Sequence, residues 1–413
     1  MKRIVIFGAG RMGEKAIRFF NSSSNIHIVA VCDNDSLKWN AEILGHIILP
    51  PEKVFSEFDF DSVLIAIYDY QEIYNWCIEK TSANVYKRIS EMIAEEAYID
   101  ITSGCNAKCL YCVTGKTNRD NAGSIRFNYL SFEKFKEIYE HLISKDLITN
   151  ETRLGLFNWG EPFLNNDFLK ICEYLSDNKQ KYILSTNASI FREAKKENTY
   201  SFCEYIYFSV PGFSQESYDR IHRFNFKTIK ENIRKIYTNM CKNGFNGDGI
   251  ISAHLYKFSI EETKELDKWA KSLGLKVGAY YPYLNGNSLF EKFLNKESDS
   301  EYIKSINEDL FVEKWIDLGK ERPKQFDCPI GDWLVIDEKG EIVLCCQSDR
   351  YCSSYYGWGS ILEVNSYNEY RKLKQKMMIS ESCIECKKLG IDYIVSNNKK
   401  LSVNNVNDIK KVF

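Results

Sequence analysis

Six apolar segments of strand length alternate with helical patterns in the middle of this 413-residue chain. The expected strands are residues 98–102, 153–159, 181–187, 205–210, 249–255 and 276–283. Repeated strand–helix units predict a parallel sheet with helices packed outside it. Six units are fewer than the eight of a closed barrel, so the sequence predicts an open, partial (β/α)6 TIM barrel over residues 96–286.

Two of the helices between these strands have clear sequence signals. Ile229, Ile233, Ile236 and Met240 recur at spacings of four, three and four, and the pattern stops at Gly244. The next helix is expected to begin with a capping box over residues 259–262 and to end at Gly274.

Charge and hydropathy exclude two classes of partner. The net charge is -2, so the chain offers no basic surface that could neutralise many phosphates, and a nucleic-acid partner is not expected. No apolar run approaches the roughly 20 residues that a membrane-spanning helix needs, and the first residues read as a strand and carry no signal-peptide pattern. The sequence therefore predicts a cytoplasmic protein.

Three cysteines form a compact loop directly after the first expected barrel strand. Cys105, Cys109 and Cys112 follow a C-x3-C-x2-C spacing. Three thiolates can hold three irons of a cubane cluster and leave the fourth iron open for a chelating ligand. Structural zinc normally has four protein ligands, and no fourth Cys or His lies nearby in the sequence. The spacing favours an iron–sulfur cluster over zinc.

This loop resembles the signature of the radical S-adenosylmethionine (SAM) superfamily. The resemblance implies that a [4Fe-4S] cluster binds SAM and reductively cleaves it to a 5′-deoxyadenosyl radical, which abstracts hydrogen from the substrate. It also implies an external electron donor such as flavodoxin or ferredoxin.

Later strand ends resemble the SAM-binding segments of the same superfamily. The residues that the resemblance assigns to SAM are Tyr111, Gly160, Glu161, Ser185, Asn187 and Ser209. Trp159 and Ala188 stand where the family has glycines, and Pro211 replaces an acid. Active sites of barrels form at the carboxyl ends of strands, which is where these residues are expected. No catalytic residue is assigned.

A second group of cysteines lies in the last ninety residues. Its members are Cys328, Cys345, Cys383 and Cys386, the last two expected in a C-x2-C loop. The spacing alone suits either zinc or a closed iron–sulfur cluster. The segment resembles the SPASM/twitch extension of radical enzymes, which implies one auxiliary [4Fe-4S] cluster, either an electron acceptor or a structural staple. Cys345 fits the spacing from Gly340 better than Cys346 does.

The first 95 residues contain a glycine loop between an expected strand and helix. Gly8, Gly10 and Gly13 are followed by Asp33 at the end of the next expected strand, as in dinucleotide-binding folds. The segment is about half the length of a full domain of that kind. It resembles the small Rossmann-like domains of bacterial sugar-modifying and surface-polysaccharide proteins, which implies either binding of a nucleotide or nucleotide-sugar, or docking.

The chain is therefore predicted to be an α/β protein with five parts. These are a Rossmann-like domain (1–95), the partial barrel (96–286), linker helices (287–325), a twitch/SPASM-like module (326–395) and a weakly ordered tail (396–413). The leading hypothesis is an oxidoreductase that oxidises or epimerises a sugar, nucleotide-sugar or related polyol, either as a small molecule or in a glycan. The alternatives are a radical enzyme that modifies peptides or proteins, and a zinc-stabilised interaction protein.

Overall fold

The computed structural model describes residues 1–23, 25–121 and 127–403. The chain divides into two compact units, and each is described by itself. Unit 1 comprises residues 1–97, 137–153 and 364–372, and unit 2 comprises residues 98–136, 154–363 and 373–413. The five-part organisation proposed from the sequence stays a prediction.

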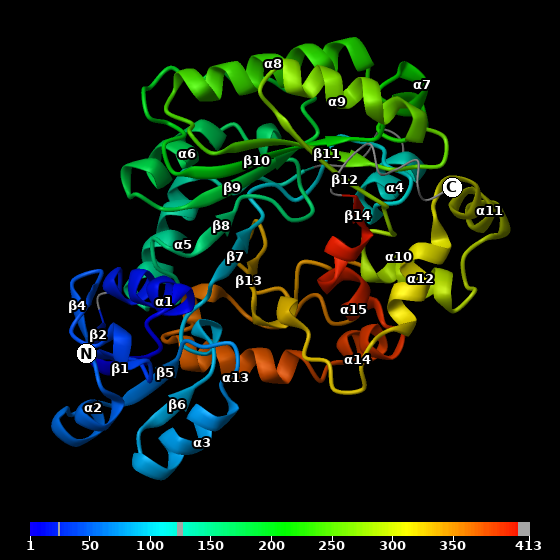
Figure 1. Ribbon diagram of the computed structural model, residues 1–413. Coiled ribbons are helices and arrows are strands. Elements are labelled where there is room, and N and C mark those ends of the chain that lie inside the picture. The colour runs from blue at the N-terminus through cyan, green and yellow to red at the C-terminus, as the bar shows by residue number, and fades with distance from the viewer. Residues whose placement is uncertain (24, 122–126, 404–413) are drawn as a thin grey trace. The chain divides into compact units, whose positions relative to one another are not determined.

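Unit 1 is built on a six-stranded sheet of order β3-β4-β2-β1-β5-β6 (Figure 1). The strands are β1 (Lys2–Phe7), β2 (Ile26–Cys32), β3 (Glu42–Ile43), β4 (His46–Leu49), β5 (Ser62–Ile65) and β6 (Asn84–Tyr86). All neighbours pair in parallel except β3 and β4. The parallel strands follow the order 3-2-1-4-5 of a Rossmann sheet, which is more than the half domain that the sequence indicated.

Strand β1 is buried on both faces of this sheet. Ile4 and Ile6 pack in a core with helix α1 (Arg11–Asn21), whereas Val5 and Phe7 pack in a second core with residues of α2 (Pro51–Glu57) and α3 (Gln71–Lys80). Alternate side chains of a strand point to opposite faces, so a continuous apolar run is what a strand covered on both sides requires. The predicted Rossmann-like character of the N-terminal region is confirmed.

Unit 2 contains an eight-stranded sheet of order β13-β7-β8-β9-β10-β11-β12-β14. The six predicted strands are β7 (Glu96–Ile99), β8 (Arg153–Gly155), β9 (Tyr182–Thr186), β10 (Cys203–Val210), β11 (Asp248–His254) and β12 (Lys276–Tyr280). From β8 to β12, each strand pairs in parallel with the next, whereas β12 pairs antiparallel with β14. The predicted α/β class with an open sheet is confirmed, and the sheet ends in the short strands β13 (Leu334–Ile336) and β14 (Ser402–Val403).

Helices connect these strands as predicted, with one error. They are α4 (Val113–Asp120), α5 (Phe132–Ser144), α6 (Phe168–Asp177), α7 (Gln215–Arg220), α8 (Phe226–Lys242) and α9 (Thr263–Ser272). The four apolar positions expected on α8 are all buried. The predicted capping box is wrong: Ser259 precedes the 3-10 turn η4 (Ile260–Glu262) and makes no cap bond, while the Glu262 carboxylate accepts hydrogen bonds from Ser214 and Ser217.

The C-terminal third is mainly helical. The segment predicted to form linker helices contains α10 (Asn287–Leu294), α11 (Ser300–Asp309) and α12 (Val312–Lys320), and its role as a linker stays a prediction. The elements that follow are η5 (Pro329–Asp332), η6 (Ile361–Glu363), α13 (Tyr367–Met377), α14 (Glu381–Lys388), α15 (Ile391–Ser396) and η7 (Asn398–Leu401). The tail that the sequence predicts to be weakly ordered is folded at η7 and β14, and its residues 404–413 lie outside the described residues.

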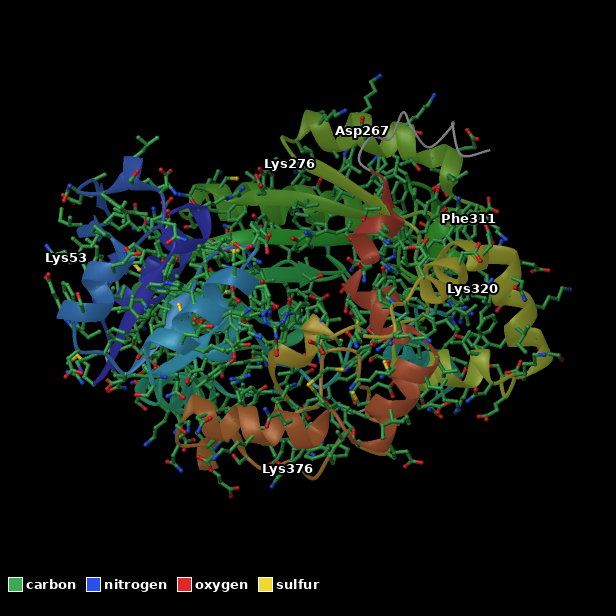
Figure 2. The ribbon with its side chains drawn as sticks, turned by 60° about the horizontal axis from the view of Figure 1, so that its bottom comes forward. Lys53, Asp267, Lys276, Phe311, Lys320 and Lys376 are labelled. Atoms are coloured by element: carbon green, nitrogen blue, oxygen red, sulfur yellow. The ribbon has the colours of Figure 1, made fainter. Side chains whose placement is uncertain are left out.

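Charged side chains project from the periphery, as Lys276, Lys320 and Lys376 show (Figure 2). Lys374 differs from Lys376, two positions away on α13, because Lys374 is buried. Among the described helices, none combines the length and the apolar character that crossing a membrane requires.

Candidate metal centres and cavities

The three-cysteine loop lies between β7 and α4, and Cys112 is the residue that caps the start of α4. The buried side chain of Asn118 on α4 donates hydrogen bonds to the carbonyl oxygens of Cys105 and of Ala107, the latter at 2.8 Å. A Cβ atom on Gly115 would lie 2.4 Å from the nitrogen of Cys109. Glycine therefore allows the first turn of α4 to pack directly on the loop.

Polar groups surround the sulfur of Cys105. The Asn187 side chain donates to Cys105 Sγ at 3.2 Å and to Asn106 Oδ1 at 3.0 Å, and the Ala107 nitrogen donates to the same sulfur at 3.4 Å. Burial raises the pKa of the Cys105 thiol to about 12. Donors at this sulfur stabilise a thiolate, which is the form that binds metal. The structure thus brings Asn187 to the cysteine loop.

Glu161 connects the loop after β8 to the end of β9. Its buried carboxylate accepts hydrogen bonds from Thr186 Oγ1 at 2.7 Å, from the Asn187 nitrogen at 2.7 Å and from the Phe163 nitrogen at 3.1 Å. Burial raises the pKa of this carboxyl to about 7, although these donors oppose the shift. Glu161 therefore positions the backbone next to Asn187, and its contact with the SAM amino group stays a prediction.

Asp100 is a site residue that the sequence reasoning missed. Its carboxylate accepts hydrogen bonds from three successive nitrogens, those of Asn158 at 3.2 Å, Trp159 at 2.8 Å and Gly160 at 3.1 Å. Burial raises its pKa to about 7. The only sequence signal was an acid directly after an apolar strand. Asp100 fixes the segment in which the SAM-binding residues Gly160 and Glu161 are predicted.

Two departures from the family pattern have visible consequences. Trp159 is buried, and its indole nitrogen donates to the Ser348 carbonyl oxygen at 2.9 Å. Ala188 takes a φ of +56°, the left-handed region that a glycine adopts without strain. The substitution at Trp159 thus links the loop after β8 to the C-terminal cysteine region.

A cavity of about 410 Å³ lies beside the three-cysteine loop. Its lining residues are Cys109, Tyr111, Cys112, Ser209, His222, Ser252, His254, Tyr256, Tyr280, Pro282, Tyr283, Asn285, Asn398 and Ser402. Of the six residues predicted to bind SAM, Tyr111 and Ser209 line this cavity, and the other four are not among its described lining residues: Gly160, Glu161, Ser185 and Asn187. No Asp, Glu, Lys or Arg belongs to the lining that the structure describes, whose polar side chains carry hydroxyls, amides, imidazoles and the two thiols. We call it the cysteine-loop cavity.

The two histidines of the cysteine-loop cavity are uncharged. Burial lowers the pKa of His222 to about 3 and that of His254 to about 4. The Nδ1 atoms of both rings are buried and have no hydrogen-bond partner among the described residues. A neutral imidazole can donate or accept one hydrogen bond at each nitrogen, depending on its tautomer. The wall of this cavity therefore contains two neutral imidazoles, of which His254 Nε2 lies 3.4 Å from Ser209 Oγ.

Tyr111 is fixed from behind the same cavity. Its hydroxyl donates to Asp309 Oδ2 at 2.5 Å, and its ring stacks against that of Tyr302 with a centroid distance of 6.4 Å. Asp309 is also paired with Arg220. The aromatic face predicted to lie near adenine is thus held in a defined orientation.

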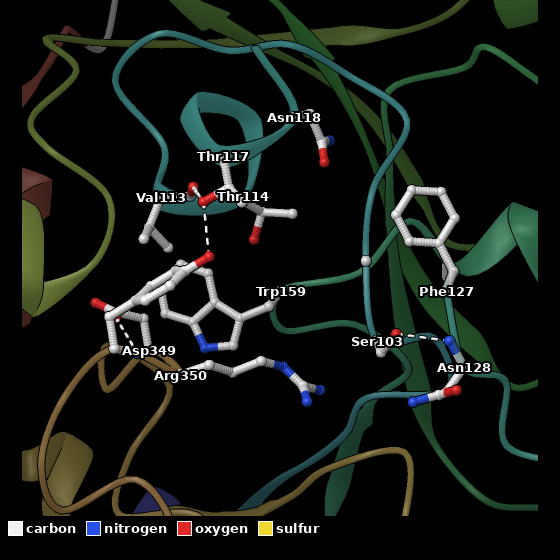
Figure 3. Close-up of a pocket in the computed structure, with 12 residues that line it drawn as sticks. Ser103, Val113, Thr114, Thr117, Asn118, Phe127, Asn128, Trp159, Asp349 and Arg350 are labelled. Atoms are coloured by element: carbon white, nitrogen blue, oxygen red, sulfur yellow. Dashed lines mark hydrogen bonds between the residues drawn. The ribbon is translucent and has the colours of Figure 1, made fainter. Parts of the chain in front are cut away.

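A different cavity, of about 210 Å³, borders the loop at Ser103 and Gly104 (Figure 3). Figure 3 shows Trp159, Asp349 and Arg350 in its wall, with Thr117 above them. Thr117 Oγ1 lies 2.9 Å from the Tyr351 hydroxyl oxygen, and the Asn128 nitrogen donates to Ser103 Oγ at 2.7 Å. Unlike the cysteine-loop cavity, this one is lined by an acid and an arginine.

All four C-terminal cysteines that the sequence singled out line one small cavity of about 40 Å³. Cys383 and Cys386 lie on helix α14, three residues apart and thus on one face, so the predicted loop is wrong at this point. Cys328 precedes η5, and Cys345 follows the hairpin of β13. Cys346 is not among the described lining residues. We call this the four-cysteine cavity.

The donor set of the four-cysteine cavity fits a cluster with four protein ligands. Burial raises the pKa of the Cys345 and Cys328 thiols, while the nearby backbone N–H groups of Gln347 and Ser348 at Cys345, and of Gly331 and Ile330 at Cys328, act in the opposite direction and favour the thiolates. Cubane clusters are held by four cysteine thiolates that receive such N–H···S bonds. Among the described residues, no three His, Cys, Asp or Glu side chains form a group suited to a single metal ion.

The glycine loop of unit 1 is tightly packed. Gly8 has a φ of +114°, and a Cβ atom there would lie 2.8 Å from the Ala66 carbonyl oxygen. A Cβ atom on Gly13 would lie 1.9 Å from the Gly8 oxygen, whereas one on Gly10 would meet nothing within 4 Å. Gly8 and Gly13 therefore serve the packing of the loop, and Gly10 alone faces open space.

Asp33 is engaged inside unit 1. Its carboxylate accepts hydrogen bonds from the Ala9 nitrogen at 2.7 Å and from Lys38 Nζ at 2.9 Å. Burial raises the pKa of Asp33, but these donors and the Asp35 nitrogen outweigh that effect and lower it overall. Asp33 thus holds the glycine loop in place, and its contact with a ribose stays a prediction.

Comparison with known proteins identifies two segments of the chain. Residues 99–270 match the model of the radical SAM superfamily, and residues 1–89 match that of the family described as C2185-like, N-terminal. No curated protein sequence matches the chain significantly.

Similar solved structures include Streptococcus suis SuiB bound to S-adenosylmethionine, with 14% identity, a TM-score of 0.45, and coverage of 79% of this chain and 83% of that one. Native anSMEcpe with bound AdoMet and Cp18Cys peptide has 15% identity, a TM-score of 0.41, and coverage of 71% and 82%. BtrN in complex with AdoMet and 2-DOIA has 15% identity, a TM-score of 0.30, and coverage of 76% and 94%.

Proposed function

We propose, from the membership of residues 99–270 in the radical SAM superfamily, that the protein is an oxidoreductase acting on a sugar, nucleotide-sugar or related polyol. Cys105, Cys109 and Cys112 are the proposed ligands of the SAM cluster. When bound, the cluster and SAM supply a 5′-deoxyadenosyl radical that removes a hydrogen atom from a substrate carbon. The residues of the chain bind and orient SAM and the substrate beside it.

The observation that carries the substrate class is the lining of the cysteine-loop cavity. This cavity is bordered by Cys109 and Cys112 and is lined by serines, tyrosines, asparagines and two neutral histidines, without a charged side chain among its described lining residues. A buried charge without a partner is costly, so such a lining favours an uncharged reacting group. Hydroxyl groups of a sugar or polyol can pair with each of these donors and acceptors.

The C-terminal cysteines are proposed to hold an auxiliary [4Fe-4S] cluster. Cys328, Cys345, Cys383 and Cys386 surround one small cavity, and this convergence supports the ligand set drawn from the sequence. Four protein thiolates leave no open iron, so the group is suited to accept an electron during a substrate oxidation. An external protein such as flavodoxin or ferredoxin is proposed as the electron donor.

Unit 1 is proposed to bind a nucleotide or nucleotide-sugar. The support is the open space at Gly10, which lies next to the first turn of α1 in a sheet of Rossmann order. Asp33 would contact a ribose only if its bonds to Ala9 and Lys38 rearranged. Isothermal titration with UDP-sugars tests this proposal, with Gly10→Val expected to abolish binding that the wild type shows.

Transfer of a labelled hydrogen tests the proposed substrate class. Reduced, reconstituted enzyme is incubated with SAM and with sugars, nucleotide-sugars and polyols that carry deuterium on carbon. We expect deuterium in 5′-deoxyadenosine from members of this class. Label arriving only from deuterated peptides would overturn the proposal.

A pair of histidine variants ties the result to the cavity. His222→Asn is expected to raise KM for the labelled substrate at least tenfold, because one buried partner of a hydroxyl is changed. His27→Asn is the matched control, since His27 is exposed in unit 1. Equal KM values for the two variants would contradict the assignment of the substrate to this cavity.

A further inference from the structure

Two amide side chains line the four-cysteine cavity without hydrogen-bond partners. Asn287, at the start of α10, has 1% of its surface exposed, and Gln347 has 5%. Asn287 Nδ2 and Oδ1 and Gln347 Nε2 are buried and unpartnered among the described residues. Buried polar groups in folded proteins are nearly always paired, so these amides require an explanation.

The two amides belong to one backbone arrangement. The Asn287 nitrogen donates to the Gln347 carbonyl oxygen at 3.1 Å, which ties the start of α10 to the turn after Cys345. The next residue, Ser288, donates its nitrogen to Asp349 Oδ2 at 2.9 Å. These bonds fix the backbone from which both amides extend, so the side chains are held at the cavity by the fold itself.

The remaining walls of the cavity offer few acceptors. Apart from the cysteines and the two amides, its described lining is largely apolar, with Ile330, Leu344, Met378, Ile391 and Val395. Its one cation among these residues, Lys387, donates to the Met378 carbonyl oxygen at 3.0 Å. Asp392, the one acid among the described lining residues, is already paired with Arg322 at 2.8 Å. The unpartnered N–H groups of Asn287 and Gln347 therefore have no protein acceptor among the described residues, and the sulfur atoms of a bound cluster would supply one.

We propose that Asn287 and Gln347 donate N–H···S hydrogen bonds to the auxiliary cluster and thereby raise its reduction potential. This inference rests on the auxiliary cluster of the proposed function. The reduced cluster carries one more negative charge than the oxidised cluster, and donors to its sulfurs stabilise the more negative state. A higher potential makes the group a better electron acceptor, as the proposed oxidation requires.

Redox titration of the holoenzyme, followed by electron paramagnetic resonance, tests the inference. The variants are Asn287→Leu and Gln347→Met, which keep similar side-chain volumes and remove the N–H donors. For each variant, we expect the equilibrium constant for one-electron reduction of the auxiliary cluster to fall about tenfold, a decrease of about 59 mV in midpoint potential. The midpoint of the SAM cluster is expected to stay unchanged.

Asn295→Leu is the matched control. Asn295 follows the opposite end of the same helix and is exposed, so the same replacement there is expected to leave both potentials unchanged. Iron content is measured on every sample. Unchanged auxiliary potentials in Asn287→Leu and Gln347→Met at full iron content would overturn the inference.

The iron content of the wild type distinguishes a failure of the proposed auxiliary cluster from a failure of this inference. About four irons per chain in the reconstituted wild type, in place of about eight, would remove the auxiliary cluster itself. If Asn287→Leu lost iron and Gln347→Met did not, the midpoint potential of the auxiliary cluster in Gln347→Met would test the inference. An unchanged potential in that variant would overturn it.

Discussion

The two cysteine sites of unit 2 use the same side chain in different settings. One presents three thiols from eight consecutive residues beside a cavity of about 410 Å³, and the other gathers four thiols from separate segments around a cavity of about 40 Å³. A site with a missing protein ligand and adjacent space suits exchange of a small ligand, whereas four ligands around little space suit a closed centre. Ligand number and adjoining volume, rather than residue type, thus separate the two proposed roles.

The side chains that line the two cavities also differ, in a way that agrees with the two proposed roles. The cysteine-loop cavity is lined by hydroxyls, amides and neutral imidazoles, and the four-cysteine cavity is mostly apolar with two unpaired amides. Polar walls can recognise a ligand that enters and leaves. Apolar walls with a few donors instead exclude water and adjust the properties of a resident group.

Removing the proposed cluster ligands on α14 is expected to have the largest effect, and it tests whether the two cysteine sites hold separate clusters. The double variant Cys383→Ala, Cys386→Ala is expected to lower iron from about eight to about four per chain, because only the auxiliary cluster loses its ligands. Iron and sulfide analysis after anaerobic reconstitution measures this. Cys241→Ala, at an exposed cysteine, is the control. Equal iron in the double variant and the wild type would show that the two sites do not differ as described.

Variants of two adjacent cysteines show which of them is a ligand of the proposed auxiliary cluster. Cys345 lines the four-cysteine cavity, whereas Cys346 does not belong to its described lining. Cys345→Ala is therefore expected to lose the auxiliary iron, about four atoms per chain, and Cys346→Ala to keep it. Mössbauer spectra of the two variants provide the measurement. The reverse pattern would assign the ligand to Cys346.

A substitution at Glu161 tests whether its hydrogen bonds to the end of β9 stabilise the region around the three-cysteine loop. Its carboxylate oxygens accept three hydrogen bonds, and the amide of Glu161→Gln would direct N–H groups at one or two of the donors. Leaving buried groups unpaired is expected to lower the free energy of unfolding by about 1–3 kcal/mol, as urea titration measures. Glu216→Gln, at an exposed acid, is the control. Equal stabilities would exclude this bracing role.

The histidines of the cysteine-loop cavity give the smallest expected effect. Burial lowers the pKa of His222 to about 3 and of His254 to about 4, below the ordinary value of 6.5, so both rings are neutral above about pH 6. Below about pH 6.5 and above the lowered pKa values, the unfolded chain binds more protons at these histidines than the folded chain does. The stability that the neutral histidines contribute is therefore complete above about pH 6.5 and is lost as the pH falls through this window.

Turnover should accordingly show no histidine ionisation between about pH 6 and pH 8. The pH dependence of kcat/KM in the wild type and in His254→Asn is the measurement. An ionisation near pH 6.5 that disappears in the variant would show that the cavity carries a charged imidazole.

The sequence carries enough local pattern to predict the strand–helix order. Apolar segments that alternate with helical patterns located the six strands, and a period of about 3.6 located helix α8, whose apolar positions are buried. The same reasoning failed at Ser259, where Glu262 pairs with Ser214 and Ser217 from a distant segment. A capping box is a local signal, and tertiary contacts that no local pattern contains decided the outcome.

Some residues of the candidate sites were also predictable from local sequence, whereas others depended on tertiary contacts. The spacing of the cysteines marked both groups as metal-ligand candidates, and the resemblance to the SPASM/twitch extension favoured a cluster for the second. Cys328, Cys345, Cys383 and Cys386 line one cavity, which agrees with the proposed set. Asp100 and Asn287 were not recognisable, because their roles depend on backbone nitrogens and cavity walls contributed by remote segments. The sequence predicts Asp33 as a ribose ligand, which stays a prediction, and it gave no signal for the bonds that Asp33 accepts from Ala9 and Lys38.

The central claim is that Cys105, Cys109 and Cys112 hold a cluster that cleaves SAM reductively. Anaerobically reconstituted protein is mixed with SAM and dithionite, and 5′-deoxyadenosine is quantified by chromatography in the wild type, Cys109→Ala and the control Cys241→Ala. The account predicts 5′-deoxyadenosine from the wild type and the control, and none above background from Cys109→Ala. Equal formation by Cys109→Ala and the wild type would contradict it.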